Sequence, residues 1–234
     1  FEVEPIGYPI TSIQVTASSA QDADMIPEKT IDGSGLNELD QHNTEATDMW
    51  LSGMGDPTPT LQYEFDQTYK LHEMWVWNSN QAIESFVGLG AKDVSIEFSE
   101  NGTDWTALQG IPAFAQAPGA RGYAHNTTVD FGGAIAKYVK LSIHAGHGML
   151  PQYGLSEVRF FNIPTAARDP QPTDGSTSDS VDVTLSWRPG REAVSHELFL
   201  GTDPSELALT ATTQKNSFEA AELDYATTYY WQIV

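Results

Sequence analysis

The sequence predicts an all-β protein made of a larger jelly-roll β-sandwich followed by a smaller sandwich. Apolar and polar residues alternate in short runs, turn-forming residues end each run, and no long segment carries an apolar stripe of helical period. Aromatic residues make up 11% of the 234 residues, and their preference for strands agrees with this fold class. Regularly spaced antiparallel strands form sandwiches of two sheets.

Six runs of alternating residues follow one another in the first two thirds of the chain. They lie at 13–15, 61–65, 74–76, 94–98, 139–143 and 158–160. Each run ends at Gly, Asn, Asp or Pro, which favour turns. After the fourth run, Asn101-Gly102 predicts a tight hairpin turn, because glycine supplies the positive φ that such a turn requires.

The order of the strands predicts that the long loops gather at one end. If successive strands run antiparallel, every second connection lies at the same end of the sandwich. The short connections 66–70, 100–104 and 132–136 then share one end, and the long connections 20–59, 78–90, 111–126 and 144–154 share the other. The long connections hold four of the six histidines, and long loops on a rigid scaffold commonly carry binding sites.

The composition excludes several kinds of partner and site. A formal charge of −21 and a pI of 4.3 would repel nucleic acid and anionic membranes. The absence of cysteine excludes disulfides and zinc–thiolate sites, and no stretch approaches the roughly 18 apolar residues of a membrane span. So acidic a chain is typical of an exported protein, and a leader could precede Phe1. We therefore expect a secreted, extracellular or cell-surface location.

The composition changes at Pro164. Residues 164–172 lack apolar periodicity and contain several prolines, which predicts a semi-rigid linker. Further alternating runs follow at 181–187, 196–200 and 227–234, and they predict a second, smaller domain over residues 173–234. No internal repeat relates the two halves.

Several segments of the first half resemble a known family in type and order. They are Ile31-Asp32-Gly33, Met49-Trp50-Leu51-Ser52, Leu61 to Phe65, Leu71 to Asn78, Val94 to Trp105 and Leu155 to Phe160. Together they resemble the discoidin, or coagulation-factor type C, domains, which overlap with bacterial carbohydrate-binding modules of the galactose-binding-like jelly roll. The resemblance covers residues 10–163 and implies a discoidin-like jelly roll over residues 1–163.

The second half resembles a fibronectin type III domain, which is an immunoglobulin-like sandwich. Leu185-Ser186-Trp187 fits its second strand, and Leu223 with Tyr229 fits the corner where a tyrosine hydroxyl bonds back to the main chain. The resemblance implies that Trp231 points inward. It also implies a further strand after Val234, so we expect this domain to be C-terminally incomplete and part of a longer polypeptide.

The resemblance to type C domains also implies one structural calcium ion, a cation that prefers six to eight oxygen ligands. The implied ligands are the side chains of Asp32 and Glu157, the carbonyl groups of Lys29 and Ser34, and Asp48, which stands where the family usually has Thr or Ser. The insertion 34–47 departs from the family pattern, so either Asp48 ligates the ion or the insertion rebuilds the site. Without the resemblance, Asp32 would merely cap a turn beside Gly33.

The loop-rich end carries side chains suited to a sugar. Sugars stack on aromatic rings and pair their hydroxyl groups with planar donors and acceptors. The candidates are His42, Asn78, Asn80, Arg121, His125, His144 and His147, with Phe86 or Tyr123 as the stacking ring. Taken singly, a loop histidine is commonly solvated, and Asn78 could simply end its strand. Family analogy points to neutral hexoses or deoxyhexoses.

Three classes of function compete. The sequence has no Gly-x-Ser-x-Gly, phosphate loop or cysteine to support catalysis, although its many acidic pairs leave a glycosidase dyad open. We favour a monomeric, non-catalytic carbohydrate-binding module that is attached to a glycan-degrading enzyme in the full-length chain. The alternative is a protein- or lipid-binding adhesive domain pair, in which residues 83–89 form an apolar spike. A spacer role is the remaining possibility.

Overall fold

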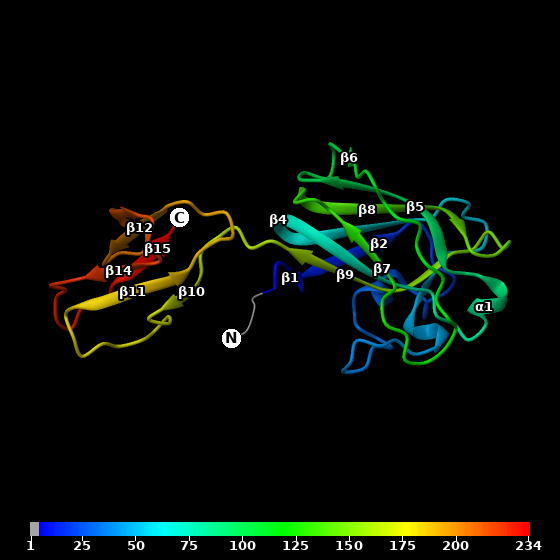
Figure 1. Cartoon of the computed structure of the whole chain (residues 1–234), viewed down its shortest axis with the longest axis horizontal. Helices are drawn as coiled ribbons and strands as arrows, with labels where there is room; N and C mark the ends of the chain where they lie inside the picture. The colour runs from blue at the N-terminus through cyan, green and yellow to red at the C-terminus, as the bar shows by residue number, and fades with distance from the viewer. Residues whose placement is uncertain (1–4) are drawn as a thin grey trace. The chain divides into compact units, whose positions relative to one another are not determined.

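The computed structural model describes residues 5–234 and is all-β, with 5% helix and 43% strand, as the sequence predicts (Figure 1). The chain divides into two compact units, Phe1–Ile163 and Pro164–Val234. None of the helices in the described part of the chain has the length and apolar character needed to cross a membrane.

The first unit is a β-sandwich with short helical segments in its loops. Its elements are β1 (Tyr8–Pro9), β2 (Ile13–Ala17), the 3₁₀ helices η1 (Pro27–Thr30) and η2 (Ala46–Asp48), β3 (Trp50–Leu51), β4 (Thr60–Asn78), α1 (Glu84–Val87), β5 (Ala91–Ser99), β6 (Thr106–Ala107), β7 (Thr127–Asp130), β8 (Ile135–Gly146) and β9 (Gly154–Asn162). The predicted hairpin joins β5 to β6, and Gly102 there has φ +77°.

A single long strand, β4, belongs to both sheets of this unit. Its first part pairs with β2 and β8, its last part pairs with β7 and β9, and the register shifts between Glu64 and Tyr69. Residues 60–64 run antiparallel to β8 and residues 71–78 run antiparallel to β9, so the chain reverses between them and residues 66–70 make the predicted connection, although they do so without interrupting the strand. The chain stays extended through this segment, because a bulge lets it leave one sheet and join the other without a loop.

The core lies between the two sheets. Alternate residues of β4, β5, β8 and β9 point into it, among them Tyr63, Leu141 and Phe160. Trp50 of β3 is fully buried in this core, and its Nε1 donates to the carbonyl of Ser19 at 3.0 Å. On β4, Trp75 and Trp77 point away from this core. They form part of a second cluster with Leu36, Ala117 and Tyr123.

The second unit consists of two three-stranded sheets with a small core between them. Its strands are β10 (Arg168–Gln171), β11 (Val183–Arg188), β12 (His196–Gly201), β13 (Ala208–Thr213), β14 (Ser217–Ala220) and β15 (Tyr230–Ile233), in the orders β10-β11-β14 and β13-β12-β15. Trp231 packs against the core, and the hydroxyl of Tyr229 accepts the N–H of Asp224 at 3.1 Å, as predicted.

Residues 164–172 do not form only the linker that the sequence predicts. Arg168–Gln171 is an edge strand paired with β11 across a register shift, and Pro170 lies within it. An edge strand tolerates proline because one of its sides makes no ladder hydrogen bonds. The segment lacks alternating apolar residues, so the sequence did not predict this short edge strand.

The long loops of the first unit meet at one end of the sandwich, as the strand order predicts. The Nδ2 of Asn80 donates to the carbonyls of Asn43 and Ala120, at 2.7 and 2.8 Å. The N–H of His147 donates to the carbonyl of Gly90 at 3.2 Å. Main-chain and amide contacts thus tie together loops that lie far apart in sequence.

Asn78, the last residue of β4, holds two of these loops. Its buried Nδ2 donates to the carbonyls of Ala91 and Ala115, at 2.7 and 2.8 Å, and its Oδ1 accepts the N–H of Ser79. Replacing it would leave the buried carbonyl of Ala91 and the partly buried carbonyl of Ala115 without this donor, and the loss of a buried partner costs about 1–3 kcal/mol.

We therefore expect Asn78→Ala to lower the free energy of unfolding by about 2–4 kcal/mol. Urea denaturation followed by tryptophan fluorescence measures it. The matched control is Gln109→Ala, an exposed amide whose loss should change the free energy by less than about 0.5 kcal/mol. Equal stability of the two variants would contradict the structural role of Asn78.

Candidate functional site

The insertion 34–47 is an ordered loop that is fastened to the loop around residue 121. His42 forms isolated β-bridges with Leu36 and with Tyr123, and its N–H donates to the carbonyl of Tyr123 at 2.7 Å. Within the insertion, the Oδ1 of Asn37 accepts the N–H groups of Leu39 and Gln41, at 2.9 and 3.0 Å. The insertion is therefore a built part of the loop end.

A groove of about 460 Å³ lies between the insertion and this second loop. It is lined by Gly35, Leu36, Asn37, Gln41, His42, Asn43, Glu45, Arg121 and Gly122. Arg121 and Glu45 form an ion pair across its rim at 3.5 Å, and their side chains are 80% and 62% exposed. The groove offers planar amide, guanidinium and carboxylate groups at short range, which suits a ligand rich in hydroxyl groups.

Four of the sequence-predicted ligand residues are buried. His42 is fully buried, and burial lowers the pKa of its imidazole. Asn78 and Asn80 are also fully buried, with their amides bonded to loop main chain. Tyr123 is nearly buried, and its hydroxyl donates to Asn126 Oδ1 at 2.7 Å and accepts the N–H of Asn78. Of these four side chains, only His42 lines the groove.

The other predicted residues lie at the loop end but do not form one cluster. Arg121 lies in the groove. His144 bonds to Ser95 Oγ at 2.8 Å on the outer face of β5 and β8, whereas His125 stacks on Trp75 beside the other sheet. His147 bonds through Nε2 to the carbonyl of Phe114 at 2.9 Å. Strand reversal brings these residues to one pole, and the two sheets then separate His144 from His125.

Phe86 belongs to an apolar tip on α1 and the neighbouring loop. It is 91% exposed, and among the described residues of the first unit it is the one aromatic side chain of the exposed class. Ile83, Met149 and Leu150 are the other exposed apolar residues of these two loops, which are joined by a bond from Gly148 N–H to the carbonyl of Gly88. Glu84 beneath them is buried.

Several groove residues were not predicted from the sequence. Asn37, Gln41, Asn43 and Glu45 all lie in the insertion. The density of amide side chains in this segment was a usable signal, because amides suit hydroxyl groups better than a lone histidine does. The histidine and strand-end residues that the sequence favoured, His42, Asn78 and Asn80, are instead fully buried.

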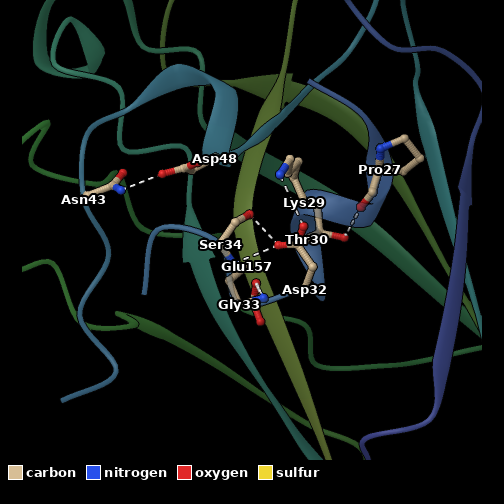
Figure 2. A network of polar contacts seen from close by, with 9 residues as sticks. All are labelled: Pro27, Lys29, Thr30, Asp32, Gly33, Ser34, Asn43, Asp48 and Glu157. Carbon is tan, nitrogen blue, oxygen red and sulfur yellow. Dashed lines mark hydrogen bonds and ion pairs between the residues drawn. The ribbon is translucent and has the colours of Figure 1, made fainter. Parts of the chain in front are cut away.

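Figure 2 shows the acidic residues implied for calcium: Asp32 and Glu157 lie side by side, and Asp48 lies apart from them, beside Asn43. The Oδ1 of Asp32 accepts the N–H and the hydroxyl of Ser34, and its Oδ2 pairs with Lys29 Nζ at 3.3 Å. Glu157 accepts the N–H of Gly33 at 3.2 Å, and Asp48 accepts the Nδ2 of Asn43 at 2.6 Å. Partial burial acts to raise the pKa of Asp32, but the hydrogen bonds from Ser34 and the charge and hydrogen bond of Lys29 together lower it.

Glu157 is the group that fits a bound cation best. It is 4% exposed, and within residues 5–234 its side chain accepts one hydrogen bond, from the N–H of Gly33. Burial raises its pKa to about 8, the N–H of Gly33 and the positive charge of Arg159 oppose this rise, and the charges of Asp32 and Asp40 make smaller contributions to it. Within the described residues, no three acidic or histidine side chains converge to hold a metal. An ion here would therefore draw on main-chain oxygens, which suits calcium.

Comparison with known proteins supports the fold of the first unit. The F5/8 type C domain model matches residues 14–154, which is more than half of the chain. No curated protein matches this chain. The structure of CBM32-3 from a family 31 glycoside hydrolase of Clostridium perfringens is 15% identical, with a TM-score of 0.51, and the alignment covers 67% of this chain and 95% of that one.

A second solved structure is equally similar. The F5/8 type C domain of a Bacteroides fragilis protein is 13% identical, with a TM-score of 0.51, and the alignment covers 68% of this chain and 98% of that one. At such identities the likeness shows a shared jelly-roll fold. Together with the sequence match over residues 14–154, it places the chain in the F5/8 type C family.

Proposed function

We propose that the first unit is a non-catalytic carbohydrate-binding module whose ligand lies in the groove between the insertion 34–47 and the loop around Arg121. The observation that carries this proposal is the set of planar polar groups that line one groove at the loop end. Asn37, Gln41 and Asn43 supply donors and acceptors, and Arg121 with Glu45 supplies a charged donor beside a charged acceptor. Such neighbouring pairs match two adjacent hydroxyl groups of a sugar ring.

The family and its neighbours support the same proposal. The Clostridium perfringens structure is described as CBM32-3 of a glycoside hydrolase, where CBM stands for carbohydrate-binding module. By analogy, the full-length protein is a secreted or cell-surface enzyme that carries this module, and the second unit is a fibronectin type III-like spacer. The module acts as a monomer and raises the local concentration of substrate near the attached enzyme.

The groove prediction concerns Arg121. We expect Arg121→Ala to weaken binding on a glycan array about tenfold or more, because a charged donor to a hydroxyl group contributes about 1.5–3 kcal/mol. Lys137→Ala removes the same charge from the unit while leaving the groove intact, since Lys137 pairs with Glu64 instead. Array signals that fall equally in both variants would show a charge effect and would overturn the groove assignment.

We also propose one structural calcium ion beside η1. Asp32 and Glu157 would bind it through carboxylates and Lys29 and Ser34 through carbonyl groups, and Asp48, whose carboxylate accepts the Nδ2 of Asn43, would join only by turning toward the ion. The support is the buried carboxylate of Glu157, which has one main-chain donor and a strongly raised pKa. A divalent cation would offset its burial and would pin the entry to the insertion, in a chain that has no disulfides.

Calcium removal tests this site. At a calcium concentration a hundredfold above Kd, binding to the native state alone adds about 2.7 kcal/mol, which corresponds to a rise in Tm of roughly 5–10 °C. We expect this rise in a thermal scan against chelator, and we expect Glu157→Gln to abolish it. Asp93→Asn, which neutralises an exposed acid on β5, should keep it. A wild-type midpoint that does not change with calcium removes the ion from the proposal.

A second candidate function rests on the apolar tip. Ile83, Phe86, Met149 and Leu150 are exposed on two joined loops, and an adhesive domain could insert such residues into a lipid surface. The surroundings do not favour it: Lys92 is the single cationic side chain of residues 79–92 and 144–154, whereas lipid-binding surfaces are ringed by basic residues.

Vesicle sedimentation separates the two functions. We expect the protein to remain in the supernatant with phosphatidylcholine vesicles, and equally with vesicles that contain phosphatidylserine, because the net charge of −21 opposes the latter. Sedimentation that is lost in the Phe86→Ala, Met149→Ala double variant would instead establish the adhesive function.

A further inference from the structure

An aromatic patch lies on the outer face of the sheet that contains β9 and the last part of β4. The ring of His125 stacks on Trp75, with centroids 4.1 Å apart and planes inclined by 10°. On β9, the ring of Phe161 lies 4.5 Å from Trp75. All three side chains are half-buried. We call Trp75, His125 and Phe161 the aromatic patch.

Planar polar groups border this patch. Both terminal nitrogens of Arg159 donate to the carboxylate of Asp40 at 3.0 Å, and the Arg159 side chain is 28% exposed. Glu73, two residues before Trp75 on β4, accepts the indole N–H of Trp75 at 2.8 Å. The hydrogen bonds from Arg159 lower the pKa of Asp40, so that this carboxylate is ionised at neutral pH. Aromatic faces next to planar donors and acceptors are the components of a sugar subsite.

The patch adjoins the groove through three links. Asp40 directly precedes Gln41, which lines the groove. Leu36 lines the groove and packs on the cluster of Trp77, Ala117 and Tyr123, which Trp75 also contacts. Gly122, at the groove, is followed three residues later by His125. The insertion and the loop around Arg121 therefore wall the groove and also border the patch.

We propose that the aromatic patch extends the groove, so that the module binds several consecutive units of a glycan chain and not only a terminal sugar. This inference rests on the proposed function and adds the length of its ligand. One or more units occupy the groove, and a following unit lies with its apolar face on the aromatic patch, with hydroxyl groups toward Asp40 and Arg159. Such an arrangement makes affinity depend on chain length.

The test uses the whole chain of residues 1–234 and an array that carries mono- to hexasaccharides of β-1,4-galactan, cellulose, laminarin, chitin and mannan. We expect one series to be retained about tenfold more strongly at its long end than at its short end, as one added aromatic contact allows. We expect His125→Ala and Phe161→Ala each to remove most of this gain while the retention of the shortest bound member changes less than about twofold.

The matched control is Trp105→Ala. Trp105 is a half-buried aromatic residue on the outer face of the other sheet, where Lys140 Nζ lies 4.4 Å from its ring centroid. Its replacement should leave the dependence on chain length intact. Thermal scans of the three variants show whether each is folded at the assay temperature.

The remaining outcomes overturn the inference in distinguishable ways. Retention that does not depend on chain length, or a loss that is equal for short and long members, would show that the aromatic patch is only structural, while the groove proposal stands. Arg121→Ala distinguishes the groove from the aromatic patch, because loss of the groove residue should weaken the retention of all members of a series, short and long. If no member of any series is retained, the proposed function fails for these glycans and the extended site fails with it.

Discussion

The geometry of the loop end depends on two buried amides, Asn78, the last residue of β4, and Asn80, two residues after it. Asn78 fixes the loops at Ala91 and Ala115, and Asn80 fixes the insertion at Asn43 and the opposite loop at Ala120. Both are fully buried, so an unmade hydrogen bond there is costly. An amide can bind two carbonyl groups and accept N–H groups at once, and Asn80 does both. The groove is therefore shaped by residues that are not themselves available to a ligand.

Much of the fold could be predicted from the sequence, because alternation along β2, β5, β8 and β9 reflects burial on one face. The continuity of β4 could not be predicted from the sequence. Asp66 and Gln67 resemble turn residues, and nothing in the local sequence shows that one strand passes from the first sheet to the second. The pole at which the long loops meet was predicted correctly from strand reversal. The sequence did not predict which side chains face solvent at that end, because the burial of His42 and Asn80 depends on contacts with residues 120–123.

The insertion 34–47 explains why family analogy alone does not locate the site. It contributes Asn37, Gln41, Asn43 and Glu45 to the groove, and it covers Trp77 through Leu36 and Asp40. The same segment connects Asp32 to Asp48, so a cation bound there would fix both ends of the loop that forms the groove. The proposed ligand binding and ion binding would in this way be coupled through one stretch of chain, although no side chain needs to serve both.

Two buried glutamates of the first unit, Glu84 and Glu157, differ in how many hydrogen bonds their carboxylates accept. Glu84 accepts the N–H groups of Leu89 and Gly90 and an amide hydrogen of Gln116, so its carboxylate is satisfied by the loop that it holds. Glu157 is equally buried, has one such donor from Gly33, and faces the charges of Asp32 and Asp40. Desolvation raises the pKa of both, but only Glu157 combines sparse hydrogen bonding with neighbouring carboxylates. A cation would stabilise a buried carboxylate most where protein donors are fewest, and this is why the proposed ion is placed at Glu157 and not at Glu84.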